Sequence, residues 1–253
     1  MTTHPNCKVN LGLNIVRKRD DGYHDIETVF APVDTLHDTL TIEPYHTTVV
    51  EQHGIVLDNA PADNLCMKAY EAMNRLCPLP SVIMRLEKRI PFGAGLGGGS
   101  SDAAFTLKML NTMFDLGLTN DQLKQLASTV GADCAFFIDN TTSYATGIGN
   151  LLQPFDLSLE AYRIEIEIPQ GVHVSTREAY SGLRLNNAPS TDLRTLLQQP
   201  IEQWRHTVKN DFEPSVMANH PAIAQLKAQM YSRGALYASM TGSGAAVFGL
   251  FKR

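Results

Sequence analysis

The chain has 253 residues, of which 43% are hydrophobic and 19% are charged, and its formal net charge is −5. This length and composition predict a globular protein with one large or two modest cores, and they exclude a largely disordered chain. The acidic balance disfavours nucleic acids and membrane surfaces as partners, but it leaves room for a local basic pocket that binds phosphates.

The four cysteines are far apart and form no C-x-x-C pair, which argues against a disulfide framework and a zinc site. The first residues lack the apolar core of a signal peptide, and glycines interrupt the most apolar stretch, residues 235–251. We therefore expect a cytoplasmic protein with reduced thiols and no membrane span.

Residues 7–15 alternate between apolar and other side chains, which predicts a strand with one face in the core. The other face carries Lys8, Asn10, Gly12 and Asn14. This face is either an ordinary solvated surface or the wall of a site, and the alternation alone does not decide between them.

Residues 17–30 predict a hairpin with Asp21-Gly22 at its tip. Tyr23 and His24 begin the returning strand, where a surface aromatic pair is the simplest interpretation. Further strands are expected at residues 40–42 and 49–50, and Asp63 is expected to cap a helix that runs to about Leu76.

The densest glycine cluster follows an alternating strand at residues 82–87 and precedes a helix-like run of apolar residues, which we expect Gly117 to end. Five glycines lie between residues 93 and 99. Backbone N–H groups of such a loop, together with the start of the helix, can converge on a phosphate.

Three other interpretations of this loop compete with a phosphate site. Gly93, Gly95 and Gly98 satisfy the dinucleotide pattern G-x-G-x-x-G, but a second helix follows the first instead of the parallel strand that such a site needs. A Walker loop needs lysine beside Ser100, where Gly99 stands. A flexible linker is disfavoured by the strand and helix on either side.

Thr119 and Gln122 have capping-box spacing and predict a helix at residues 121–130. Asp133 follows in an apolar segment, as a helix cap or as a functional carboxylate. Gly147 and Gly149 are expected to form a turn that ends the first domain.

The second half predicts a strand at residues 162–168 and a capping box from Ser175 to Glu178. Helices are expected at residues 192–197, 201–208 and 221–233, the last ended by Gly234. Two strands around a Gly-Ser-Gly loop explain residues 235–251.

Several of these motifs together resemble the GHMP kinase superfamily. The stretch Pro91-x-Gly93-x-Gly95-Leu96-Gly97-Gly98-Gly99-Ser100-Ser101-x-Ala103-Ala104 resembles its phosphate loop, and residues 237–248 resemble its third motif. Cys7-Lys8-Val9-Asn10-Leu11 and Gly131-Ala132-Asp133-x-x-Phe136-Phe137 resemble its catalytic segments, with Cys7 and Val9 as conservative departures. Asp21-Gly22-Tyr23-His24 resembles the signature of its branch that acts on a cytidyl alcohol.

The resemblance implies roles for these positions. Lys8 and Asp133 would be catalytic, and the ATP site would comprise Asn64, Leu65, Lys88, Pro91, Phe92, Gly93, Ala94, Gly95, Leu96, Gly97, Gly98, Gly99, Ser100 and Ser101. The substrate site would comprise Asn10, Tyr23, His24, Thr176, Gly242 and Ser243. For Asn64 and Lys88 a structural role, and for Thr176 a capping role, explain the local pattern equally well. The Gly-Ser-Gly loop should lie near the first glycine loop.

The implied fold is α+β, with domains at residues 1–154 and 155–253 and the active site in the cleft between them. The implied activity is phosphorylation of the 2-hydroxyl of 4-diphosphocytidyl-2-C-methyl-D-erythritol by ATP and Mg²⁺, in the non-mevalonate route to isoprenoids, with no metal ligand assigned. The alternatives are a GHMP kinase for homoserine or mevalonate and a non-catalytic ligand sensor. Because the chain stops directly after the third motif, we also expect a missing C-terminal layer, which a homodimer partner or another element would replace.

Overall fold

The computed structural model describes residues 1–55, 63–183 and 191–253. The chain divides into two compact units. The first unit comprises Met1–Lys8, Pro32–Phe92 and Gly97–Thr141, and the second comprises Val9–Ala31, Gly93–Leu96 and Thr142–Arg253. Each unit is built from more than one segment of the chain. The expected boundary between two domains after residue 154 stays a prediction.

The first unit contains a sheet in the order β1-β4-β6-β5, in which β4 and β6 are antiparallel and β5 and β6 are parallel. Its strands are β1 (Thr2–Thr3), β4 (Thr39–Pro44), β5 (Val49–Gly54) and β6 (Val82–Lys88). Leu40 pairs with Leu86 and Ile42 with Met84, and all four side chains are buried. The predicted alternation of residues 82–87 therefore corresponds to a real core face.

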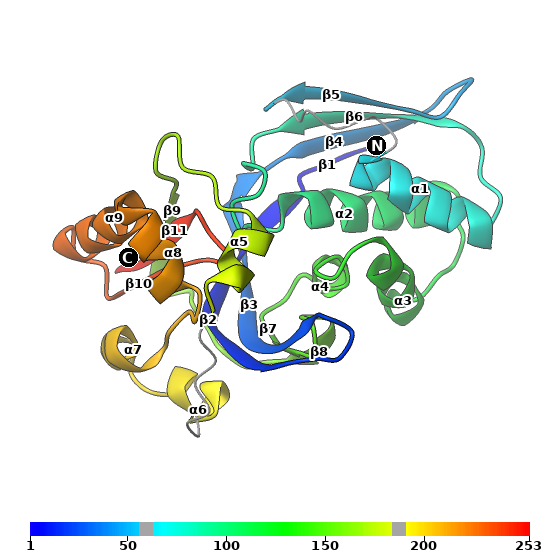
Figure 1. Cartoon of the computed structure of the whole chain (residues 1–253). Coiled ribbons are helices and arrows are strands. Elements are labelled where there is room, and N and C mark those ends of the chain that lie inside the picture. Colours follow the sequence, from blue (N-terminus) through cyan, green and yellow to red (C-terminus); the bar gives the residue numbers. More distant parts are fainter. Residues whose placement is uncertain (56–62, 184–190) are drawn as a thin grey trace. The chain divides into compact units, whose positions relative to one another are not determined.

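Helices α1 (Leu65–Leu76) and α2 (Gly98–Met113) pack on each other and against this sheet, and α3 (Asn120–Val130) and α4 (Phe136–Asp139) pack against α2 (Figure 1). The capping box of α3 is formed by Thr119 and Gln122, as predicted. Two predicted ends are wrong. Asn64, not Asp63, caps α1, because its side chain accepts the bond from the N–H of Cys66. The helix α2 ends at Met113, so Gly117 lies in the turn after it.

A second sheet has the order β2-β3-β7-β8, with strands β2 (Asn6–Lys18), β3 (His24–His37), β7 (Ser143–Thr146) and β8 (Leu151–Pro154). The predicted hairpin is present, because β2 and β3 flank the turn that contains Asp21-Gly22. Gly147 and Gly149 lie in the turn between β7 and β8, as expected.

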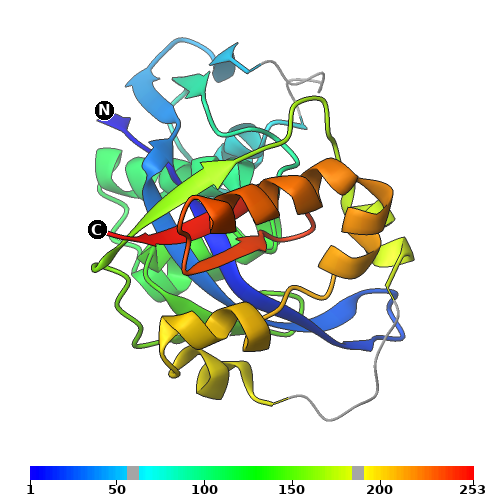
Figure 2. The same ribbon diagram turned by 90° about the vertical axis from the view of Figure 1, so that its left-hand side faces the viewer.

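The second unit also contains the antiparallel sheet β10-β11-β9, on which α9 (Pro221–Ser232) packs (Figure 2). Its strands are β9 (Tyr162–Glu167), β10 (Tyr237–Met240) and β11 (Val247–Lys252), and its other helices are α5 (Thr176–Ser181), α6 (Leu193–Leu197), α7 (Ile201–Thr207) and α8 (Glu213–Asn219). The core of this unit joins α8, α9, β10 and β11 through apolar residues such as Val216, Ile223, Met240 and Val247.

None of the helices within the described ranges is both long and apolar enough to cross a membrane.

Candidate active site

Lys8 and Asp133 lie together in the first unit. Lys8 is on β2 and is buried, and its Nζ lies 3.6 Å from Oδ2 of Asp133, whose side chain is 32% exposed. Burial lowers the pKa of Lys8, and the carboxylate of Asp133 opposes that shift. The site thus pairs a buried ammonium with a carboxylate that solvent or a substrate can reach.

Asp133 does not cap the helix that follows it. The N-cap residue of α4 is Ala135, and within the described residues no side chain caps that helix. The turn between α3 and α4 instead presents the Asp133 carboxylate to Lys8. Of the two interpretations of this aspartate, the structure therefore excludes the helix cap.

The glycine loop requires glycine for two physical reasons. Gly93, Gly95 and Gly97 have φ values of 67°, 77° and 71°, in the left-handed region that side chains disfavour. At Gly97 an added Cβ would lie 3.1 Å from the Phe137 ring and 3.2 Å from Cε of Lys8. The loop therefore passes directly over the side chain of Lys8 within the first unit.

Helix α2 begins in this loop. Gly97 is its N-cap, and among the described residues no side chain caps the first turn. N–H groups at such a helix start, with the positive end of the helix dipole, suit an anionic ligand. A Cβ at Gly98 would lie 2.7 Å from Cγ2 of Ile90, so the strand before the loop also packs closely against the helix start.

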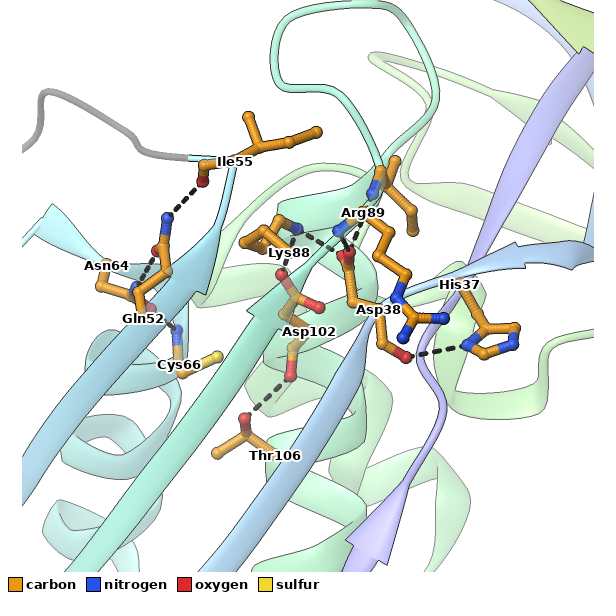
Figure 3. A network of polar contacts seen from close by, with 11 residues as sticks. His37, Asp38, Gln52, Ile55, Asn64, Cys66, Lys88, Arg89, Asp102 and Thr106 are labelled. Carbon is orange, nitrogen blue, oxygen red and sulfur yellow. Dashed lines mark hydrogen bonds and ion pairs between the residues drawn. The ribbon is translucent and has the colours of Figure 1, made fainter.

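Two residues of the predicted ATP site, Asn64 and Leu65, lie at the start of α1. Asn64 caps α1, and its Nδ2 donates to Oε1 of Gln52 at 3.2 Å (Figure 3). Leu65 opens α1, and its Cδ1 lies 3.3 Å from the position of a Cβ on Gly99. Asn64 thus has a structural role as the cap of α1. Contact of Asn64 or Leu65 with ATP stays a prediction.

Lys88 belongs to a buried group that we call the carboxylate–lysine cluster: Asp38, Lys88 and Asp102. The Nζ of Lys88 donates to Oδ2 of Asp38 and, at 2.7 Å, to Oδ2 of Asp102 (Figure 3). Burial alone would lower the pKa of Lys88, but the two carboxylates outweigh it and raise that pKa. The Lys88 ammonium, predicted to contact ATP, is therefore already bound by two carboxylates.

Asp38 anchors the same cluster to the backbone that leads into the glycine loop. Its Oδ1 accepts the N–H groups of Arg89 at 2.5 Å and Ile90 at 2.8 Å (Figure 3). Sequence reasoning missed Asp38, because its partners lie about 50 residues away and nothing local marks it.

Asp102 is the unusual member of the cluster. Burial raises its pKa to about 7, with Lys88 opposing and Asp38 adding to the shift. Its Oδ1 and the neighbouring Oγ of Ser101 are buried and have no hydrogen-bond partner within the described structure. The cluster contains two carboxylates and one ammonium, so its net charge is negative when both carboxylates are ionised.

The remaining predicted site residues lie in the second unit. Asn10 donates through its Nδ2 to Oγ1 of Thr28 at 3.0 Å, and Thr28 donates to the carbonyl of Gly12. The side chains of Thr176 and Ser243 are 3.5 Å apart at their hydroxyl oxygens, and Ser175, not Thr176, is the N-cap of α5. The structure thus brings Thr176 to the Gly-Ser-Gly loop.

The Gly-Ser-Gly loop lies against Ala94 and Gly95 of the first glycine loop, as expected. An added Cβ on Gly95 would lie 2.0 Å from the carbonyl oxygen of Thr241, and one on Gly242 would lie 3.0 Å from Cα of Gly95. The N–H of Ala246 donates to the carbonyl of Ala94 at 3.2 Å. Both segments belong to the second unit, so this approach is a feature of that unit alone.

Tyr23 and His24 differ in their surroundings. Tyr23 is 62% exposed at the hairpin, whereas the ring of His24 stacks on Tyr180 of α5, with centroids 4.6 Å apart and planes 28° apart. Burial, with a smaller effect of Lys18, lowers the pKa of His24. Tyr180 was not predicted, although its spacing of four residues from Thr176 on one helix places both on the same face.

Among the described residues, no group of three or more histidine, cysteine or acidic side chains is arranged to hold a metal ion. The four cysteines are free thiols, three of them buried.

The fold and these sites define a class of small-molecule kinase. Residues 64–141 match the GHMP kinases N terminal domain, and residues 193–253 match the GHMP kinases C terminal domain. The chain belongs to the GHMP kinases. A mevalonate kinase from Methanococcus jannaschii, 16% identical, has the same fold with a TM-score of 0.68, covering 100% of this chain and 90% of that one.

Within this family the chain is similar to one particular enzyme. The 4-diphosphocytidyl-2-C-methyl-D-erythritol kinases of Bacteroides thetaiotaomicron and Bacteroides fragilis are 48% and 46% identical to it, covering 100% and 99% of this chain and 92% of each relative. A crystal structure of 4-(cytidine 5'-diphospho)-2C-methyl-D-erythritol kinase is 32% identical, with a TM-score of 0.83, and covers 99% of this chain and 90% of that one.

Proposed function

We propose that this chain transfers the γ-phosphoryl group of ATP to the 2-hydroxyl of 4-diphosphocytidyl-2-C-methyl-D-erythritol, a step of the non-mevalonate isoprenoid pathway. The observation that carries the proposal is the contact of Lys8 with Asp133 beneath a glycine loop, in a chain that is 48% identical over its whole length to a kinase of that name. Phosphoryl transfer asks a protein mainly for positioning and charge stabilisation, which these residues can provide.

Asp133 and Lys8 would act on the acceptor hydroxyl. Asp133 would orient the hydroxyl and accept its proton as the oxygen attacks phosphorus. Lys8, 3.6 Å away from that carboxylate, would draw in the acceptor oxygen by its positive charge. The partial exposure of Asp133 supports this role, since the carboxylate must be reachable by the substrate.

The glycine loop would bind the triphosphate. The positive φ values at Gly93, Gly95 and Gly97 and the helix start without a side-chain cap among the described residues fit a chain of phosphates. Mg²⁺ would be held mainly by phosphate oxygens, which fits a protein without an acidic metal cage in its described part. When bound, the ion would neutralise charge on the transferring group.

The cytidyl group would bind at the hairpin of the second unit. Tyr23 is exposed and available to stack on a base, and the His24 imidazole is held by Tyr180, so that its polar edge can pair with the base. Thr176, Ser243 and Asn10 would complete the acceptor side. We further infer a cytoplasmic location, which the free thiols support, and no nucleic-acid partner, in keeping with the net charge of −5.

A coupled assay that measures ADP release with the cytidyl substrate, homoserine and mevalonate tests this proposal. We expect turnover with the cytidyl compound and none above background with the other two. Turnover of homoserine or mevalonate alone would contradict the substrate assignment. Nucleotide binding without turnover of any of the three would indicate a non-catalytic sensor.

A further inference from the structure

Thr241 lies at the meeting point of three stretches in the second unit. It is completely buried, directly before Gly242. Its Oγ1 accepts the N–H of Asn10 at 3.1 Å and lies 3.1 Å from Oδ1 of Asn10 and 3.2 Å from the carbonyl oxygen of Gly95. A hydroxyl has one proton to donate, so the proton of Thr241 is directed to Asn10 or Gly95.

The peptide groups on both sides of Thr241 are fixed by a second buried residue. Nδ2 of Asn210 donates to the carbonyls of Met240 and Gly242, each at 2.8 Å, and its Oδ1 accepts the N–H of Phe212 at 3.0 Å. A buried amide that uses both its donors and its acceptor is a rigid support. Asn210 therefore holds the backbone before and after Thr241.

The opposite side of Thr241 is closed by the phosphate loop. No Cβ fits on Gly95, because it would lie 2.0 Å from the carbonyl oxygen of Thr241. The N–H of Thr241 donates to the carbonyl of Ala246 at 2.9 Å. Thr241 thus has little freedom to move without moving Gly95 or Asn10.

We propose that Thr241 is a positioning residue that couples the acceptor-side Asn10 to Gly95 of the phosphate loop, with Asn210 holding it in place. The inference rests on the proposed function, in which Asn10 contacts the acceptor and Gly95 the triphosphate. In phosphoryl transfer the two reactants must be aligned closely, and a misplacement of about 1 Å can cost on the order of 100-fold in rate. One hydroxyl bound to both sides sets that alignment.

Thr241→Val removes the hydroxyl and keeps the shape, whereas Thr241→Ser keeps the hydroxyl and removes a methyl group. We expect Thr241→Val to lower kcat by roughly 10- to 100-fold and to raise KM for both substrates, because both sides lose their shared partner. Thr241→Ser should stay within about threefold of wild type. If the valine variant does not fold, Thr241→Ala replaces it in the same comparison.

A double-mutant cycle separates coupling from mere stability. If Thr241 acts through Asn10, the losses of Thr241→Val and Asn10→Ala in kcat/KM should not multiply, and the double variant should be at least about fivefold better than their product. The proposal is overturned if the two losses in kcat/KM multiply. It is also overturned if Thr241→Val has a lower Tm than wild type but the same kcat and KM.

The same variants distinguish this inference from the proposed function. If the wild-type chain does not phosphorylate the cytidyl substrate, the proposed function fails, and calorimetric binding of ADP then tests the coupling to Gly95. Thr241→Val should bind ADP at least about fivefold more weakly than Thr241→Ser. Equal ADP affinity of the two variants would overturn the inference, whatever the substrate is.

Discussion

At the scale of single residues, the Asp133 carboxylate contacts Lys8, and Ala135, not Asp133, holds the N-cap position of α4. We expect Asp133→Asn to lower kcat by about 100-fold or more, since assistance by a general base is commonly worth that much. ATP affinity should hardly change, because the amide keeps the size of the side chain. Steady-state kinetics and ADP binding by calorimetry measure the two effects.

Asp121→Asn is the matched control, because that side chain is 86% exposed on α3. It should leave kcat within about twofold of wild type. If Asp133→Asn behaves like this control, the role of Asp133 in proton transfer is wrong.

Asp102 makes stability depend on pH in an unusual direction. The folded chain holds a proton on this carboxyl up to a pKa of about 7, whereas an unfolded aspartate releases it near about pH 3.9. Between these values the folded state binds more protons, so the free energy of unfolding falls as pH rises. Above about pH 7 the full cost of the buried charge is present.

Asp102→Asn removes this cost, because an amide does not ionise, and its side-chain oxygen can take the place of Oδ2, which accepts from Lys88 in the structure. We expect the Tm difference between the variant and wild type to be larger at about pH 8.5 than at about pH 5. The increase should be about 2–4 °C for each kcal/mol of cost removed. Thermal melts at both pH values measure the gain, and Asp121→Asn again serves as the control. An equal Tm difference at the two pH values would show that Asp102 does not titrate in this range.

At the scale of elements, short sequence patterns predicted the strands and helices that depend on neighbouring residues. Alternation predicted the strands at residues 7–15 and 162–168, and the Thr119–Gln122 capping box predicted α3. The helices α4 and α8 were missed, because they are short and neither has a side-chain cap among the described residues. The glycine loop and its approach to the Gly-Ser-Gly loop were predicted, but the hydrogen bond between Thr241 and Gly95 was not, since the two residues are 146 positions apart.

The glycine loop offers a prediction with a built-in control. Gly93 and Gly95 have similar φ values, 67° and 77°, but an added Cβ meets nothing within 4 Å at Gly93 and a carbonyl oxygen at 2.0 Å at Gly95. Both alanine variants therefore carry the same kind of backbone strain, about 1 kcal/mol. Only Gly95→Ala also displaces the loop.

We expect Gly95→Ala to raise KM for ATP at least about tenfold, while Gly93→Ala stays within about threefold. Kinetics with ATP varied at saturating cytidyl substrate provide the measurement. Equal effects of the two alanines would mean that strain alone, and not the contact with Thr241, determines the loop's function.

At the scale of the whole molecule, the sequence predicted the family, because its motifs are contiguous and specific. The catalytic roles of Lys8 and Asp133, which lie in contact, stay a prediction. The sequence did not predict the carboxylate–lysine cluster or the hydrogen bonds of Thr241 to Asn10 and Gly95, because both sets join residues that are distant in the chain and individually ordinary. Each of the two compact units combines several segments of the chain, and the expected domain boundary after residue 154 stays a prediction. The residues predicted to contact ATP or the acceptor belong to both units.

Ligand binding to the whole folded chain provides the last prediction. A ligand at a hundredfold excess over its Kd stabilises the folded state by about 2.7 kcal/mol, which corresponds to roughly 5–10 °C in Tm for a chain of this size. We expect ADP and the cytidyl substrate each to raise the Tm of the wild type. Tyr23→Ala should lose most of the cytidyl shift, because one base–aromatic stack is worth about 1–3 kcal/mol, and should keep the ADP shift.

His24→Ala should behave like Tyr23→Ala, through the loss of a hydrogen bond to the base and of the ring that stacks on Tyr180. Tyr45→Ala, at another exposed aromatic side chain, is the control and should keep both shifts. If all three variants keep both shifts, the hairpin is an ordinary surface. If Tyr23→Ala and His24→Ala lose both shifts together, the hairpin affects nucleotide binding as well, and the separation of a cytidyl site from an ATP site is wrong.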